Sequence, residues 1–84
     1  MSKNQKKIWI TGASSGIGKA LAEKFTSNGW KVAVSARRKE ILDEMAKNEN
    51  ISSYPLDVTD QDQISEVFAK IINDFGSLDL CVFS

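Results

Sequence analysis

The stretch TGASSGIG, residues 11–18, decides the fold of this chain. Its three glycines come directly after a short apolar run, and apolar residues at helical spacing follow them. Glycine permits a tight turn and lets peptide N–H groups approach a bound anion, and a following helix directs its positive dipole end at the same place. The stretch therefore predicts a strand-to-helix turn that holds the phosphates of a dinucleotide. The residues expected at those phosphates are Gly12, Ser14, Ser15, Gly16, Ile17 and Gly18.

Two other motifs overlap this stretch, and both lack a necessary residue. Residues 12–16 match the G-x-S-x-G nucleophile elbow, but the chain has no histidine to act as the base. Residues 13–20 nearly match a Walker A loop, but Ala13 replaces its first glycine and Ala20 replaces the Ser or Thr that binds magnesium. A hydrolase and an NTPase are therefore disfavoured. The alternative to a binding site is a glycine-rich turn that only packs the strand against the helix.

Composition excludes several other classes of protein. The 84 residues allow one small domain, and eleven basic residues balance eleven acidic ones, so no general attraction to nucleic acid or membrane is expected. No apolar run approaches the ~18 residues of a membrane span, and we expect no signal peptide. The absence of histidine removes the commonest metal ligand, and no metal site is expected. A single cysteine, Cys81, fits a reducing, cytoplasmic location, and we expect it to be buried in a strand.

Hydrophobic periodicity predicts strands that alternate with helices along the whole chain. Such alternation favours parallel pairing and right-handed crossovers, hence one half of a doubly wound α/β sheet with strand order 3-2-1-4 and helices on both faces. Thr59 is expected to cap the third helix. The apolar fourth strand has a free outer edge, which invites aggregation or pairing with another chain. The expected strands are 7–11, 30–35, 51–56 and 80–83, and the expected helices are 17–27, 39–47 and 59–75.

The tip of the second strand reads Ser35-Ala36-Arg37-Arg38 and contains no carboxylate. An acidic residue at this point binds the ribose 2′-hydroxyl of NAD, whereas an arginine accepts the 2′-phosphate of NADP. The sequence therefore favours NADP over NAD, with Arg37 the better candidate and Arg38 beside it. The alternative is an ordinary basic start of a helix.

Asp57 and Val58 follow the third strand. The Asp57 carboxylate can accept a hydrogen bond from the amino group of adenine, and the Val58 backbone can read the edge of the ring. From spacing alone, an aspartate that merely precedes a helix is an equally good explanation.

Taken together, the chain resembles the N-terminal half of the classical short-chain dehydrogenase/reductase family. The residues that carry the resemblance are 11–18, Ala36-Arg37-Arg38, Leu56-Asp57-Val58-Thr59 and Leu78-Asp79-Leu80. The resemblance implies a Rossmann fold and an NAD(P)-dependent oxidoreductase that acts on alcohols or carbonyls, usually as a dimer or tetramer. It also implies that Asp57 touches adenine and that the Thr11 hydroxyl braces the loop after the fourth strand, where Ser84 falls.

The resemblance implies a catalytic serine and a Tyr-x-x-x-Lys pair that residues 1–84 do not contain. The one tyrosine is Tyr54, and Val58 stands four residues beyond it. We therefore expect residues 1–84 to be the cofactor-binding half of the domain, without a catalytic residue and inactive in isolation. The alternatives are a non-catalytic nucleotide-binding module and a structural fragment that pairs through its exposed sheet edge.

Overall fold

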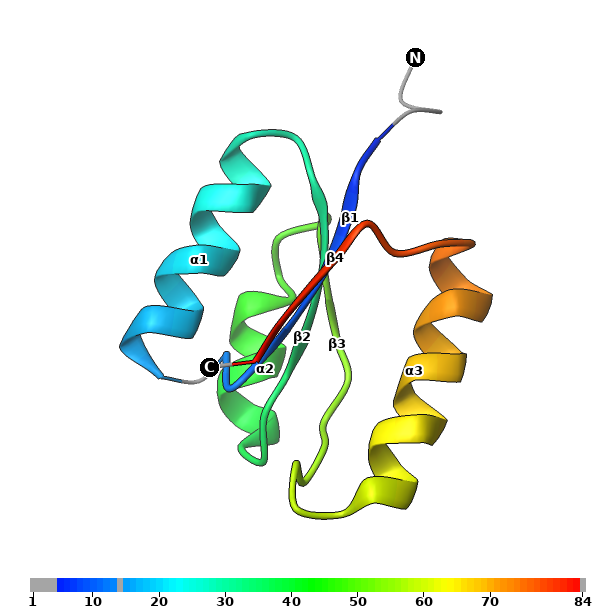
Figure 1. Ribbon diagram of the computed structural model, residues 1–84. Helices are drawn as coiled ribbons and strands as arrows, with labels where there is room; N and C mark the ends of the chain where they lie inside the picture. Colours follow the sequence, from blue (N-terminus) through cyan, green and yellow to red (C-terminus); the bar gives the residue numbers. More distant parts are fainter. Residues whose placement is uncertain (1–4, 14, 84) are drawn as a thin grey trace.

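The computed structural model describes residues 5–13 and 15–83, and it confirms the predicted order of strands and helices (Figure 1). Pairing continues beyond β3, since the N–H groups of Tyr54 and Leu56 donate to Val34 and Ala36. The regular strand nevertheless ends at Ser53, earlier than predicted. The elements are β1 (Lys7–Thr11), α1 (Gly16–Ser27), β2 (Lys31–Ser35), α2 (Lys39–Met45), β3 (Ile51–Ser53), α3 (Gln61–Phe75) and β4 (Leu80–Phe83).

The four strands form one parallel sheet in the order β3-β2-β1-β4, as predicted. In the register of this sheet, Ile8 lies between Val32 on β2 and Leu80 on β4. Helices α1 and α2 cover one face and α3 covers the other (Figure 1). In the described part of the chain, no helix has the length and apolarity to cross a membrane.

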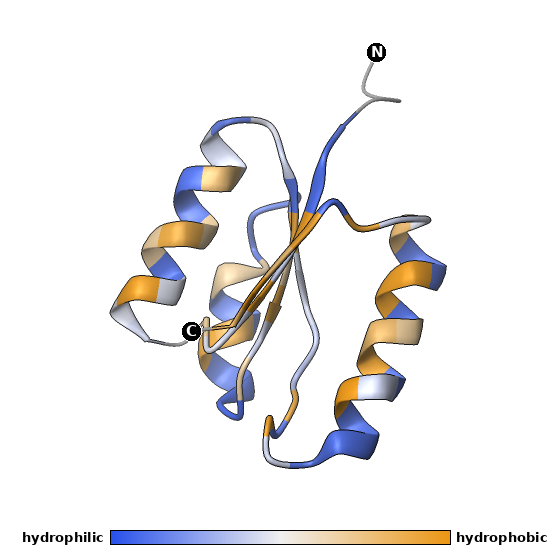
Figure 2. Cartoon of the chain, viewed as in Figure 1, coloured by the Kyte–Doolittle hydropathy of each residue, from blue (hydrophilic) through white to orange (hydrophobic). Residues whose placement is uncertain are grey.

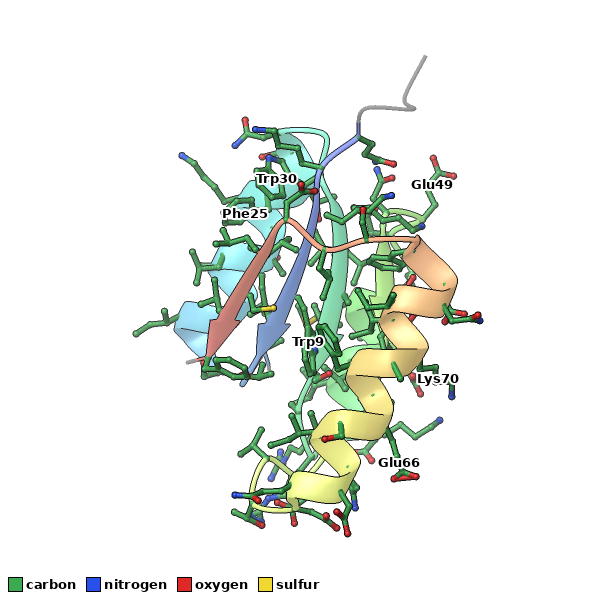
Figure 3. All side chains as sticks on the ribbon, turned by 45° about the vertical axis from the view of Figure 1, so that its right-hand side comes forward. Trp9, Phe25, Trp30, Glu49, Glu66 and Lys70 are labelled. Atoms are coloured by element: carbon green, nitrogen blue, oxygen red, sulfur yellow. The ribbon has the colours of Figure 1, made fainter. Side chains whose placement is uncertain are left out.

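Alternate residues of the strands build a separate core on each face of the sheet. Ile8 and Ile10 pack toward α1 and α2, and the intervening Trp9 packs toward Ile71 and Phe75 of α3. Trp9 lies between the sheet and α3 in Figure 3, and its buried indole N–H donates to the Ser35 hydroxyl over 2.9 Å. This period-two alternation is what a sheet covered by helices on both faces requires.

An aromatic pair fixes the C-terminal end of α1. The rings of Phe25 and Trp30 meet edge to face with centroids 4.8 Å apart (Figure 3). The backbone N–H of Trp30 also donates to the Phe25 carbonyl. The chain therefore reverses tightly through Gly29, whose φ of 87° suits glycine.

Two of our local predictions were wrong. Thr59 does not cap α3, because Asp60 accepts from the N–H groups of Asp62 and Gln63 instead. Cys81 is exposed rather than buried, because β4 is the last strand on its side of the sheet in the described residues. Leu80 and Phe83 on the same strand remain 43% and 67% exposed, so this edge is apolar and open.

Candidate cofactor-binding site

The loops that follow β1, β2 and β3 meet at one edge of the sheet, at the lower end of Figure 1. Parallel strands bring their carboxyl ends together, and this edge is where open α/β sheets bind ligands. Ser14 lies outside the described residues. Every other residue predicted to bind the cofactor belongs to one of these loops or to the first turn of α1. Figure 2 shows that the first turn of α3 is hydrophilic, in contrast to the central strands, whereas the loop before it contains both hydrophobic and hydrophilic residues.

Ser15 organises the glycine loop as the N-cap of α1. Its hydroxyl donates to the Gly12 carbonyl over 2.8 Å and accepts from the Gly18 N–H over 3.1 Å. The hydroxyl hydrogen is thus used within the loop, whereas we expected it to face a phosphate. The Ala13 N–H also donates to the Ser35 carbonyl, which anchors the loop to the end of β2.

The three glycines of the loop have different physical roles. Gly12 has a φ of 71°, a backbone conformation that side chains disfavour. A Cβ on Gly18 would collide with the Gly12 carbonyl and would lie 2.8 Å from the Ala13 Cα, so glycine is needed for close packing. A Cβ on Gly16 would meet nothing within 4 Å. Gly16 therefore borders open space at the positive end of α1, which is a suitable cradle for an anion.

An open apolar groove continues from this loop along α1. It has a volume of about 500 Å³ and is lined by Gly16, Ile17, Ala20, Leu21 and Lys24. Ile17 is 73% exposed at the end nearest the loop. An apolar surface is thereby available beside the predicted phosphate site.

A single backbone hydrogen bond brings the two remaining parts of the site together. The Leu56 N–H donates to the Ala36 carbonyl over 3.1 Å. Because Arg37 follows Ala36 and Asp57 follows Leu56, these two residues lie on neighbouring segments at the same edge of the sheet. Both arginine side chains are exposed, and in the described part of the chain neither Arg37 nor Arg38 forms a salt bridge. The guanidinium groups are therefore available to an anionic ligand.

The Asp57 carboxylate is held in a turn of its own. Its Oδ1 accepts from the Thr59 hydroxyl over 2.6 Å and from the Thr59 N–H over 3.0 Å. These two bonds lower the pKa of Asp57, and Arg37 adds a smaller effect of the same sign. Among the described residues, Oδ2 of Asp57 and the N–H of the exposed Val58 have no hydrogen-bond partner.

Gln63 is a residue at this site that sequence reasoning missed. Its Oε1 accepts from the Asp57 N–H over 3.1 Å, and its Nε2 donates to Asp60 Oδ2 over 3.2 Å. A glutamine three residues after a capping aspartate is a capping-box signal, and that spacing could have revealed it. In this chain the glutamine reaches back beyond the cap to Asp57.

Thr11 is the last residue of β1, and Tyr54 directly follows β3. The Thr11 hydroxyl donates to the Val82 carbonyl over 3.4 Å and so links the ends of β1 and β4. The Tyr54 hydroxyl donates to Asp74 over 2.8 Å beneath α3, and burial, with Asp74 as a second cause, raises the pKa of Tyr54. Tyr54 thus ties β3 to α3 and does not face the predicted cofactor.

A parallel β3-β2-β1-β4 sheet with a glycine turn after its first central strand defines the first half of a dinucleotide-binding α/β domain. A family model described as short chain dehydrogenase matches residues 6–84. The chain belongs to the short-chain dehydrogenase family.

Curated relatives in this family include oxidoreductases from bacteria and mammals. An uncharacterized oxidoreductase of Staphylococcus haemolyticus is 42% identical over 87% of this chain and 33% of its own length. A 3-oxoacyl-[acyl-carrier-protein] reductase of Thermotoga maritima is 41% identical over 87% of this chain and 32% of its own. A 15-hydroxyprostaglandin dehydrogenase [NAD(+)] of Bos taurus is 36% identical over 98% of this chain and 34% of its own. The chain thus spans about a third of the length of these relatives.

Solved structures agree with this assignment. A short-chain dehydrogenase from Streptomyces avermitilis superposes with a TM-score of 0.87 at 38% identity, over 96% of this chain and 30% of that one. A structure described as ElxO with NADP bound has a TM-score of 0.87 at 39% identity, over 95% of this chain and 34% of that one. The nucleotide-binding Rossmann region of an oxidoreductase family is therefore the part of the fold that this chain represents.

Proposed function

We propose that this chain is the cofactor-binding portion of an NADP-dependent oxidoreductase that acts on a carbonyl or alcohol substrate. The observation that carries the choice of cofactor is the tip of β2, where Arg37 is exposed, unpaired among the described residues and adjacent to the Asp57 turn. Relatives include both a dehydrogenase named for NAD(+) and a structure with NADP bound. The choice of NADP over NAD therefore rests on the residues at the tip of β2 and not on the relatives.

The guanidinium of Arg37 would bind the 2′-phosphate of the adenosine ribose, with Arg38 beside it. Arginine suits this task because its planar fork donates two parallel hydrogen bonds to a phosphate. Hydrogen bonds to charged groups are worth about 1.5–3 kcal/mol each, so loss of such contacts weakens binding about tenfold or more.

The glycine loop would hold the pyrophosphate. Gly12, Gly16 and Gly18 shape it, Ser15 caps the helix behind it, and the open space at Gly16 fits an anion. Ser14 and Ile17 complete the predicted contacts, with Ser14 as a hydroxyl donor and Ile17 as the exposed apolar wall.

The Asp57 turn would bind the adenine base. Its Oδ2 is an acceptor for the exocyclic amino group, and the Val58 N–H is a donor for the neighbouring ring nitrogen. Together with Arg37 these groups recognise both ends of a 2′-phosphorylated adenosine.

In the complete enzyme, the bound nicotinamide supplies chemistry in which a hydride passes between its C4 and a carbonyl or alcohol carbon. Residues 1–84 contain neither the serine nor the Tyr-x-x-x-Lys pair that the family resemblance implies. We therefore propose that this chain binds the adenosine end of NADP and is inactive in isolation. The single cysteine also fits a cytoplasmic protein, and the whole enzyme would be a homo-oligomer.

A structural fragment that pairs through its sheet edge is the second candidate, and the open apolar β4 favours it. Calorimetric titration of the 84-residue chain with 2′,5′-ADP and with 5′-AMP distinguishes the two. The proposal expects 2′,5′-ADP to bind about tenfold more tightly or better, and Arg37→Ala to abolish that preference. Lys70→Ala, on the outer side of α3 (Figure 3), should leave it unchanged. Equal affinity for both nucleotides would refute the choice of NADP, and no binding to either would leave only the structural fragment.

A further inference from the structure

The turn between β3 and α3 is held by one side chain that reaches back from the helix. Gln63 accepts from the Asp57 N–H through Oε1 and donates to Asp60 through Nε2. Its amide group therefore connects the first residue of the turn to the cap of α3. Because Gln63 itself is exposed, it contributes to the turn through these hydrogen bonds and not through core packing.

The consequence is that Asp57 is fixed at two points. Gln63 holds its backbone N–H, and Thr59 holds its carboxylate through Oδ1. Two polar groups remain without partners among the described residues, an acceptor at Asp57 Oδ2 and a donor at the Val58 N–H. Neighbouring residues of a short turn therefore present one acceptor and one donor.

This pair of groups matches one purine edge and mismatches another. Adenine offers an exocyclic amino donor next to a ring-nitrogen acceptor, which complements the turn. Hypoxanthine offers an exocyclic oxygen acceptor next to a ring N–H donor. Its oxygen would face the acceptor Asp57 Oδ2 and its N–H would face the Val58 N–H, so neither hydrogen bond could form. The selectivity depends on the relative placement of the two groups, because hydrogen bonds weaken steeply when they are misaligned.

Resting on the proposed function, we propose that Gln63 is a positioning residue that makes the turn selective for adenine over hypoxanthine. Gln63 does not itself touch the base. It orients the peptide plane between Leu56 and Asp57, and so sets where Asp57 Oδ2 and the Val58 N–H lie relative to each other.

Gln63→Met tests this role, because methionine keeps the length of the side chain but has no amide group. The backbone N–H of residue 63 still donates to Asp60 Oδ1, so the cap of α3 is retained. Gln61→Met is the matched control, since Gln61 lies in the same turn, is exposed and has no side-chain hydrogen bond to another described residue. The ligands are 2′,5′-ADP, its hypoxanthine counterpart and 5′-AMP, each titrated into the full 84-residue chain.

The proposal expects Gln63→Met to reduce the ratio of adenine to hypoxanthine affinity about three- to tenfold, the size expected for one lost hydrogen bond. The ratio of 2′,5′-ADP to 5′-AMP affinity should stay at its original value, because Arg37 is untouched. Gln61→Met should change neither ratio. An unchanged base ratio in Gln63→Met would overturn the role of Gln63 and leave the proposed function intact. If the original chain bound 2′,5′-ADP but did not discriminate between the bases, adenine recognition by the turn would itself be refuted.

Amide hydrogen exchange provides a readout that does not depend on a ligand. In Gln63→Met the Asp57 N–H should exchange about three- to tenfold faster, while the Ile71 N–H in the middle of α3 keeps its protection. Unchanged exchange at Asp57 would also overturn the proposal. Faster exchange at Ile71 as well would mean that Gln63 stabilises the whole helix, which contradicts a purely positioning role.

Discussion

Gly18 lies directly against Gly12, so closely that a Cβ on Gly18 would overlap the Gly12 carbonyl oxygen. This contact lets α1 begin immediately beside the end of β1, with its first turn directed at the candidate phosphate site. Gly16 belongs to the same helix start but borders open space. The two glycines thus separate the packing role of the loop from its binding role.

Gly18→Ala should destabilise the fold by about 1–3 kcal/mol, the usual cost of overpacking against backbone that cannot move away. Gly16→Ala should leave the free energy of unfolding unchanged or slightly higher, because Gly16 has no positive φ and alanine reduces the entropy of the unfolded chain. It should nevertheless weaken the binding of 2′,5′-ADP or NADPH, because its methyl group occupies the space proposed for the phosphate. Urea unfolding and calorimetric titration measure the two effects. Full nucleotide affinity in Gly16→Ala would contradict the proposed phosphate position.

Thr59→Val should raise the pKa of Asp57 toward its ordinary value of about 3.9, since it removes the hydroxyl that contributes most to the lowering. Because the pKa of Asp57 is lowered in the folded state, its ionised carboxylate stabilises the turn at pH values above the ordinary pKa. This stabilisation is lost as the pH falls through the lowered pKa. Carbon-13 NMR titration of the Asp57 carboxyl group measures the change. Thr26→Val, whose hydroxyl bonds to Ala22 in α1, should leave this titration unaltered. A pKa that stays equally low without the Thr59 hydroxyl would assign the lowering to another group.

Tyr54→Phe should lower the free energy of unfolding at neutral pH by about 1 kcal/mol, because the ring is retained and only the bond to Asp74 is lost. The raised folded-state pKa of Tyr54 means that the neutral phenol stabilises the fold below its ordinary pKa of about 10. This stabilisation is lost as the pH rises above that value. The difference between the two proteins should therefore shrink in alkaline solution. Urea unfolding at neutral and alkaline pH measures it, and a constant difference would rule out ionisation of Tyr54 as its source.

Leu80→Lys should reduce self-association of the isolated chain. The β4 edge carries no charge or proline of its own, whereas β3 on the opposite side is only three residues long and followed by Pro55. Edge lysines commonly prevent strands from pairing with other chains. Light scattering over a range of protein concentrations measures the effect, and Glu66→Lys on the outer side of α3 is the control (Figure 3). If Leu80→Lys and the original chain associate equally, the β4 edge is not the surface involved.

The local properties of the sequence determined the order of strands and helices, the parallel class of the sheet and the position of the glycine turn. These features follow from short-range physics, namely hydrophobic period, the conformational freedom of glycine and the spacing of apolar residues in α3. The same reasoning located Arg37 and Asp57 at the ends of their strands. It could not decide whether Asp57 was more than a loop aspartate.

Only the tertiary structure decided how those residues are arranged with respect to one another. The bond from Leu56 to Ala36 joins segments twenty residues apart, and it sets Arg37 beside the Asp57 turn. The exposure of Cys81 depends on which strand ends the sheet, a property of the whole assembly of strands and not of the residue. Hydrogen bonds of this kind depend on ångström-scale distances between side chains. The position of the Gln63 amide between Asp57 and Asp60 is therefore a property of the tertiary structure.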